Sequence, residues 1–221
     1  QKRLAEVGVG DQELTVPVCN PSKHCVISYW LGSSDSNPAE FETQQNLWYH
    51  SKPETDNYIR TAFESDLASA ENGDLSHWRN TAEGSLALVI LLDQFSRNLY
   101  RGTPAVYAND AQAQDVVVSL LERDGHLGFN IPARIIFYHP LHHAENLKFQ
   151  RKAVSLFEEM LEDASDEWRE SISGNLAFIK SHCDIISKFG RFPHRNTILG
   201  RQSTPEECQY LQQDKRTYGQ Q

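Results

Sequence analysis

The chain has 221 residues, of which 39% are hydrophobic and 23% are charged, so it can bury a substantial core and is not disordered overall. Its formal net charge of −9 argues against general binding to nucleic acid or to an anionic membrane surface. The longest apolar run, residues 86–92, is too short for a membrane-spanning helix, and no signal-peptide pattern opens the chain. Because no glycosylation sequon occurs either, we expect a cytoplasmic protein.

The first part of the chain has little hydrophobic periodicity. Residues 1–25 contain Gly8, Gly10, Pro17 and Pro21, which predicts an irregular arm ahead of one helical domain over residues 26–221. A short apolar segment, VISYWL at 26–31, is either a strand or a first helical turn. Residues 33–55 are polar and loop-like, apart from LWY at 47–49, which we expect to anchor this stretch to the core.

From residue 56 onward the pattern is helical. Apolar residues recur every three or four positions, which predicts helices over residues 56–72, 83–100, 109–123, 133–138, 147–161 and 167–189. Gly190 fits as a carboxyl-terminal cap, and the sequence from Thr204 to Glu207 carries a complete start signal for a last helix. No run of alternating β-branched residues appears, so the sequence predicts an all-α fold.

The first segment whose residues could take part in binding or catalysis is LLDQFSRNLYRG at 91–102, where charged residues follow directly on the apolar run. Helical spacing places Asp93, Arg97 and Arg101 on one stripe, with Gln94 and Asn98 beside them. A desolvated carboxylate and guanidinium need partners, so we expect this stripe to meet other polar groups or a ligand. An internal salt bridge that locks two helices is the alternative.

The second segment is FYHPLHHAE at 137–145. Pro140 is expected to break the helix here and to keep His139 and His143 off a common helical face. The spacing also lacks the HExxH arrangement, and the four cysteines form no close CxxC pair, so we expect no metal site. His143 is predicted to act as a general acid or base with Glu145 orienting it, and capping and packing roles are the alternative.

The third segment is the loop FGRFPHRNTILGR at 189–201, within a stretch that holds basic residues and no acid. Arg191, Arg195 and Arg201 supply forked donors that match carboxylate or phosphate, and the next helix adds a dipole that favours anions. His194 lies among them as a second acid or base. His182 is predicted to face inward near this loop, unless it is a satisfied core histidine.

These segments together carry a family resemblance. The sequence resembles the bacterial and fungal domain-of-unknown-function 924 family from about residue 26 to residue 211, through YWLG at 29–32, LWY at 47–49, LLDQFSRN at 91–98, PLHHAE at 140–145, GRFPHRN at 190–196 and LGR at 199–201. The resemblance implies a compact array of helical hairpins, described as tetratricopeptide-like, and implies no established reaction. YWLG and LWY stand where the family more often has FWFG and WF, so we expect a different local pocket lining.

Our leading hypothesis is a cofactor-free enzyme in which the three segments converge on a pocket. Acid/base chemistry would come from His143, Glu145, His194 and Asp93, while Arg97, Asn98, Arg101, Arg191, Arg195, Arg201 and His182 would bind an anionic or carbonyl-bearing small molecule. The reaction would be an isomerisation, cyclisation, elimination or hydrolysis. No phosphate loop, dinucleotide fingerprint or nucleophile elbow is present, which disfavours kinases, Rossmann oxidoreductases and α/β-hydrolases.

Two alternatives stay open at this point. The chain could be a binding module that holds a peptide or acidic partner in an open groove through Arg191, Arg195 and Arg201. It could also hold a purely structural network, in which each arginine is already paired with an acidic residue and no room is left for a ligand.

Overall fold

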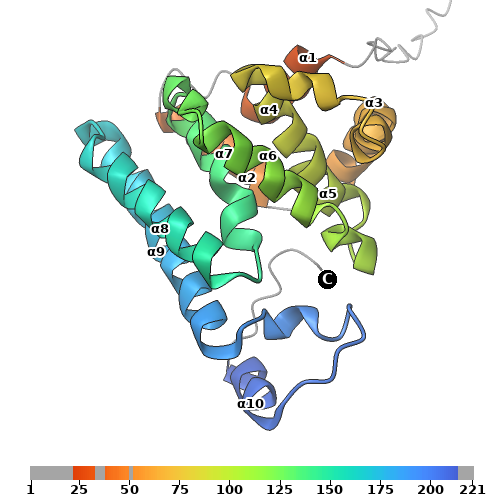
Figure 1. Ribbon diagram of the computed structural model, residues 1–221, viewed down its shortest axis with the longest axis vertical. Helices are drawn as coiled ribbons and strands as arrows, with labels where there is room; N and C mark the ends of the chain where they lie inside the picture. The colour runs from red at the N-terminus through yellow and green to blue at the C-terminus, as the bar shows by residue number, and fades with distance from the viewer. Residues whose placement is uncertain (1–21, 33–37, 50–51, 214–221) are drawn as a thin grey trace, which may run out of the picture.

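The computed structural model describes residues 22–32, 38–49 and 52–213, and every regular element within these ranges is helical (Figure 1). The all-α prediction is therefore confirmed. The longer helices are α1 (Lys23–Leu31), α2 (Pro38–Tyr49), α3 (Pro53–Glu71), α4 (Ala82–Val89), α6 (Asp110–Leu121), α7 (Ile131–His143), α8 (Leu147–Glu162), α9 (Asp166–Phe189) and α10 (Pro205–Gln213). Most of the predicted arm, residues 1–21, lies outside the described residues.

Shorter turns connect these helices. They are η1 (Ser76–Asn80), η2 (Ile90–Phe95), α5 (Ser96–Leu99), η3 (Pro104–Tyr107), η4 (Gly125–Gly128) and η5 (Pro193–Arg195). The predicted helix over residues 83–100 is thus a continuous run of α4, η2 and α5, in which η2 is a π-helical turn.

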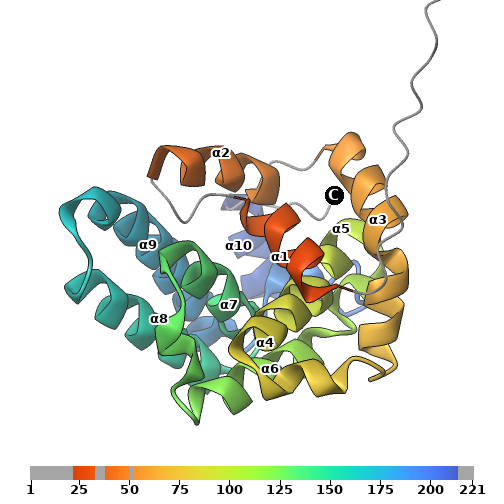
Figure 2. The same cartoon turned by 90° about the horizontal axis from the view of Figure 1, so that it is seen from above.

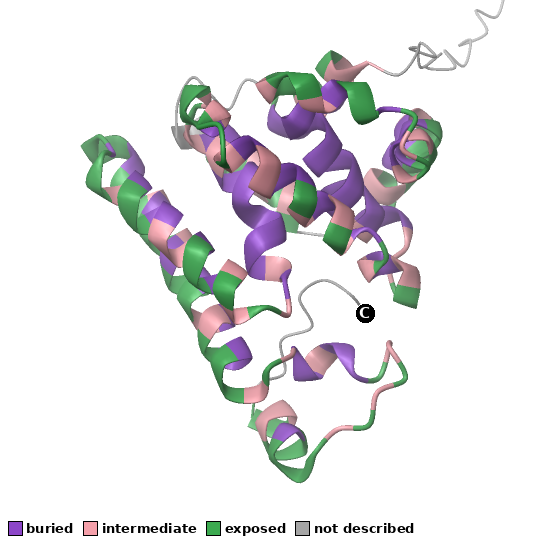
Figure 3. Cartoon of the chain, in the orientation of Figure 1, coloured by how far each residue is buried: buried purple, intermediate pink, exposed green. Residues whose placement is uncertain are grey.

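The core forms around this run and α7. Residues 86–92 are at most 4% exposed, which explains why the sequence there is apolar without periodicity. In Figure 3 the run of α4, η2 and α5 and the helix α7 carry the most continuous purple, the colour of buried residues. Helix α7 packs against α4, α6, α8 and α9, so residues at its carboxyl end are held from several sides.

Helices α8 and α9 form a hairpin beside this core (Figure 1). Each buries one apolar face, with Ala153 and Phe157 on α8 and Ile172 and Ile179 on α9 almost fully covered. Gly190 ends α9 with a φ of 69°, as predicted for a carboxyl-terminal cap that needs the left-handed conformation. The hairpin carries the chain to the loop of the third segment.

The prediction of a loop over residues 33–55 is wrong for α2. Gln44 and Trp48 donate side-chain hydrogen bonds to the carbonyl of Trp30 at 2.6 and 2.7 Å, and Phe41 packs edge-on against Trp168 on α9. Tertiary contacts therefore hold a helix whose own pattern is too polar to predict it. Figure 2 shows α2 lying across one side of the molecule. The segment at 26–31 is likewise helical, as part of α1.

The predicted helix break at Pro140 is also wrong. Helix α7 continues through Pro140 to His143, although proline has no N–H to donate to the carbonyl of Ile136. Packing against α4, α6, α8 and α9 holds the helix across the proline, and the His139 ring adds a hydrogen bond from its Nδ1 to the carbonyl of Ile135 at 2.6 Å. His139 and His143 consequently do share a helical face, with ring centroids 5.6 Å apart.

Candidate functional site

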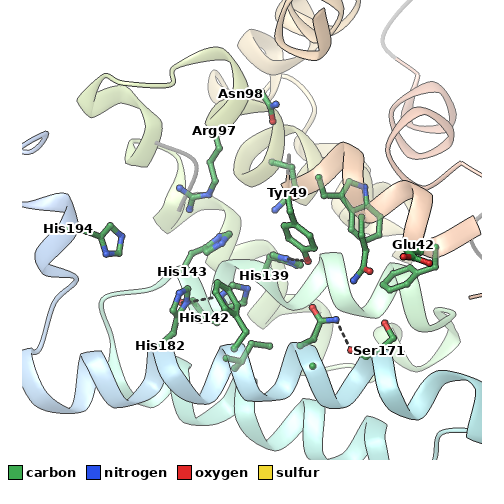
Figure 4. Close-up of a pocket in the computed structure, with 18 of the residues that line it drawn as sticks. Glu42, Tyr49, Arg97, Asn98, His139, His142, His143, Ser171, His182 and His194 are labelled. Atoms are coloured by element: carbon green, nitrogen blue, oxygen red, sulfur yellow. Dashed lines mark hydrogen bonds between the residues drawn. The ribbon is translucent and has the colours of Figure 1, made fainter. Parts of the chain in front are cut away.

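A pocket of about 920 Å³ opens among α2, α5, α7, α9 and the loop that follows α9 (Figure 4). All three sequence segments reach it. The predicted site residues that line it are Arg97, Asn98, Arg101, His143, His182, His194 and Arg195. The other lining residues are Phe41, Glu42, Gln45, Trp48, Tyr49, Gln94, Tyr107, His139, His142, Glu167, Glu170, Ser171, Gly174, Asn175, Phe178 and Ile179.

Asp93 lies directly behind the pocket wall and is fully buried in the π-helical turn. Its carboxylate accepts hydrogen bonds from Nδ1 of His143 at 2.8 Å, from the guanidinium of Arg97 at 3.1 Å and from the amide of Gln94. Turns of this kind are rare and often occur at functional sites. Burial alone would raise the pKa of Asp93, but His143 and Arg97 outweigh it and hold the pKa below its usual range.

His143 is the imidazole that Asp93 orients. Because an ionised carboxylate only accepts hydrogen bonds, Nδ1 of His143 must carry the proton, which leaves Nε2 as the acceptor nitrogen. Burial lowers the pKa of His143, and the charge of Arg97 lowers it further, although Asp93 opposes both. The ring is therefore neutral at neutral pH, and Asp93 is placed to stabilise the imidazolium that would form on protonation.

Two guanidinium groups lie next to this pair and share Asp110. Arg97 donates to Asp110 at 2.7 Å, and Arg195 donates to it at 3.4 Å and to the carbonyl of His143 at 2.9 Å. The Arg195 guanidinium also stacks on the ring of Tyr107, with its central carbon 4.3 Å from the ring centroid. Burial raises the pKa of Asp110 above its usual value, although the charges of Arg97 and Arg195 oppose the rise.

The remaining histidines of α7 and α9 have defined tautomers. His139 uses Nδ1 for a backbone carbonyl, so its Nε2 accepts the hydroxyl hydrogen of Tyr49 at 3.1 Å. His182 directs Nδ1 at the carbonyl of His142 at 3.3 Å and at Nδ1 of His142 at 3.1 Å (Figure 4). Burial lowers the pKa of His139 and of His142, so these rings are uncharged at neutral pH.

The structure places Glu145 away from His143, which corrects the predicted pair. Glu145 instead accepts two hydrogen bonds from Arg201 at 2.6 and 2.9 Å and one from the backbone N–H of Phe192 at 2.8 Å. The residue that orients His143 is Asp93, fifty positions earlier. Local spacing pointed to Glu145 because it follows His143 closely in the chain, but α7 ends between them.

Arg191 and Arg201 also lie outside the pocket lining. Arg191 donates to both carboxylate oxygens of Glu207 at 2.7 and 2.8 Å. Glu207 also accepts the N–H of Thr204, so the predicted start signal of α10 forms as a reciprocal capping box. The amino terminus of α10 is therefore occupied by its own glutamate, and these contacts fasten the loop that carries His194 and Arg195.

Several lining residues carried no signal that sequence reasoning used. Tyr107 lies in the short turn η3, where only its contacts with Arg97 and Arg195 give it a role. Tyr49 belongs to the LWY motif, which predicted an anchor to the core and no part in a site. Phe178, Glu167 and Glu170 lie in the helix predicted over residues 167–189, where no feature of the sequence marks them as site residues.

Two further properties concern the whole described part of the chain, residues 22–32, 38–49 and 52–213. Within these ranges no group of three or more histidine, cysteine, aspartate or glutamate residues is arranged to hold a metal ion. No helix there is long and apolar enough to cross a membrane.

Comparison with known proteins places this geometry in a family. A solved structure of a protein of unknown function, ATU0120 from Agrobacterium tumefaciens, is similar with a TM-score of 0.72 and 32% sequence identity over 87% of this chain and 97% of that one. No curated protein matches the chain. The family described as "Bacterial protein of unknown function (DUF924)" matches residues 26–215. The chain belongs to the DUF924 family.

Proposed function

We propose that the protein is a cofactor-free enzyme that moves protons on a small molecule bearing a carbonyl or an anionic group. The observation that carries the proposal is the pair of a fully buried Asp93 and a partly exposed His143 at the wall of a large pocket. A neutral imidazole held by a buried carboxylate is a general arrangement for acid–base catalysis. The pocket volume lies within the range of small-molecule sites.

The first step would be removal of a proton from the carbon next to the carbonyl group. The C–H bond breaks, Nε2 of His143 takes the proton, and the electron pair moves to the carbonyl oxygen as an enolate. Asp93 would stabilise the imidazolium, and Arg97 and Arg195 lie next to this pair, bonded to Asp93 and to the carbonyl of His143. Return of the proton to a different atom gives an isomer, and loss of a neighbouring group gives an elimination.

Other outcomes begin from the same arrangement. Attack of the enolate carbon within the same molecule gives a cyclisation, and His143 acting on a water molecule gives a hydrolysis. His194 reaches the pocket from the loop after α9 and would serve as the second acid or base (Figure 4).

A binding module for an acidic partner is less well supported. Arg191 and Arg201 would form most of its clamp, yet their guanidiniums already hold Glu207 and Glu145. A purely structural network agrees with this pairing of the arginines. It gives no reason, however, for a 920 Å³ pocket beside them.

Proton exchange with solvent tests the proposal without a known substrate. The purified protein is incubated in D₂O with a panel of ketones, aldehydes and esters, and deuterium incorporation next to the carbonyl is followed by mass spectrometry. We expect faster exchange for one chemical class than in buffer alone. His143→Asn should abolish it, because asparagine keeps a donor toward Asp93 but removes Nε2.

The matched control is His77→Asn, since His77 is exposed and far from the pocket lining. It should exchange at the wild-type rate. Equal exchange in wild type, His143→Asn and buffer for every compound would rule out the proposed chemistry, provided that both variants keep the wild-type melting temperature within a few degrees.

A further inference from the structure

The charges around the pocket bear on which ligand it can hold. Three arginines line it, and each is already matched by a carboxylate, with Asp93 and Asp110 on Arg97, Asp110 on Arg195 and Asp56 on Arg101. Three glutamates line the same pocket. With the lining histidines of α7 neutral, the surroundings carry more negative than positive charge.

The terminal nitrogens of Arg97 and Arg195 are directed at protein groups, while the Nε of each is buried without a hydrogen-bond partner among the described residues. Arg97 directs its terminal nitrogens at Asp93, Asp110 and the carbonyl of Val106. Arg195 directs its terminal nitrogens at Asp110 and the carbonyl of His143, while its flat faces lie against aromatic rings. A bound phosphate would lose its hydration, and no arginine of the pocket lacks a carboxylate partner to compensate for that loss, so its binding is unfavourable.

The half of the pocket between α2 and α9 combines aromatic and apolar side chains with the three glutamates. Phe41, Trp48, Phe178 and Ile179 line it, and Phe178 is 39% exposed at its edge. In Figure 4, Glu42 and Ser171 mark this half, opposite Arg97 and His194. The amide groups of Asn98 and Gln94 are suited to a neutral carbonyl or hydroxyl group, and Nε2 of His143, an acceptor, is suited to a hydroxyl group or to an acidic C–H bond.

From these observations we infer that the pocket takes an uncharged carbonyl compound with an apolar or aromatic body, and excludes phosphorylated and carboxylated molecules. The inference rests on the proposed function and narrows its ligand class from anionic or carbonyl-bearing molecules to neutral ones. The carbonyl oxygen would lie at the end with His143 and the arginines, and the apolar body would lie against Trp48 and Phe178.

Four probes that share a phenylalkyl body and differ in their head group test this inference. They are benzylacetone (a neutral ketone), hydrocinnamate (a carboxylate), phenethyl phosphate and phenylpropylammonium. Affinities for the full-length protein are measured at neutral pH by ligand-detected NMR and calorimetry. We expect benzylacetone to bind about ten times more tightly than hydrocinnamate and phenethyl phosphate, since a single charge near the pocket shifts affinity by that order.

Two charge variants sharpen the test. Asp110→Asn removes one matching carboxylate and should raise the affinity for hydrocinnamate about tenfold. Asp56→Asn should raise the same affinity, and because Asp56 is more exposed than Asp110 this variant serves if Asp110→Asn folds poorly. Asp74→Asn changes the net charge equally on an exposed residue away from the pocket and should leave the affinity unchanged.

Tighter binding of any charged probe by the wild type would overturn the inference, and so would binding of none of the four. Failure of both charge variants to strengthen hydrocinnamate binding would overturn it as well. Deuterium exchange of benzylacetone separates the two proposals. If benzylacetone binds but no compound of the carbonyl panel exchanges deuterium, the ligand class stands and the acid–base function is ruled out. If a carboxylated compound binds more tightly than benzylacetone and exchanges deuterium, the acid–base function stands and the ligand class is ruled out.

Discussion

The chemistry of the site depends on a few side chains whose roles are set by their partners. Asp93 holds His143 in one tautomer, accepts a charge-assisted hydrogen bond from Arg97 and is shielded from water. Proximity in the chain predicted Glu145 for the first of these roles, but the pairing joins residues fifty positions apart. Only the packing of the π-helical turn against the end of α7 brings them together, and no local pattern encodes that packing.

Among single-residue substitutions, Asp93→Asn tests the role of the carboxylate most directly. Asp93→Asn keeps the shape but lets His143 place its proton on either nitrogen, so we expect deuterium exchange to slow by about 10²–10⁴-fold. Exchange rates at several substrate concentrations check this. An Asp93→Asn protein that folds and exchanges at the wild-type rate would show that the carboxylate has no catalytic role.

Glu145 is expected to matter for positioning and stability. Its hydrogen bonds with Arg201 and the Phe192 N–H tie the loop of His194 to the end of α7. Because both side chains are about one quarter exposed, solvent weakens the ion pair, and we expect Glu145→Ala to lower the free energy of unfolding by about 1–3 kcal/mol. Urea unfolding measures this, and an unchanged midpoint would contradict it.

At the scale of elements, the long helices could be predicted and their exceptions could not. Helices α3, α6, α8 and α9 follow clear apolar periodicity, and Gly190 and Thr204 mark an end and a start correctly. Helix α2 was missed because hydrogen bonds to α1 and packing on α9 hold it. The continuation of α7 through Pro140 was missed because packing against four other helices holds it there.

Gly174 on α9 offers a test of the pocket that leaves its polar residues untouched. It lines the pocket within a helix, and a β-carbon added there would meet no atom within 4 Å. Gly174→Trp should therefore fold and block benzylacetone binding by filling the space. Gly174→Ala should bind normally and raise the free energy of unfolding by about 0.5–1 kcal/mol. Undiminished binding in Gly174→Trp would place the ligand elsewhere.

At the scale of the whole molecule, buried histidines couple folding to pH. Burial lowers the pKa of His126, His139 and His142 below the value of about 6.5 expected in the unfolded chain. Below that pH the unfolded chain binds more protons than the folded protein, so the stabilising effect of these groups is complete above 6.5 and is lost as the pH falls. The free energy of unfolding should decrease steadily from pH 7 to pH 5, and a flat profile would contradict this.

The convergence of three distant segments on one pocket could be anticipated from their residue types, because buried charges need partners. Which residues line it and which fasten the loop required the fold. Arg195 and His194 turn inward, whereas Arg191 and Arg201 bind Glu207 and Glu145. Their identical chemistry in the sequence gave no means of separating the two sets.

The central claim is that His143 is a neutral imidazole, with its proton on Nδ1 facing Asp93 and with Nε2 ready to accept a proton. Nitrogen-15 NMR of the histidine rings at pH 7, with His143→Asn used for assignment, tests it directly. We predict one protonated nitrogen, Nδ1, and an Nε2 shift typical of an unprotonated ring nitrogen. A proton on Nε2 at that pH would contradict the account, whether the ring is the other tautomer or the imidazolium.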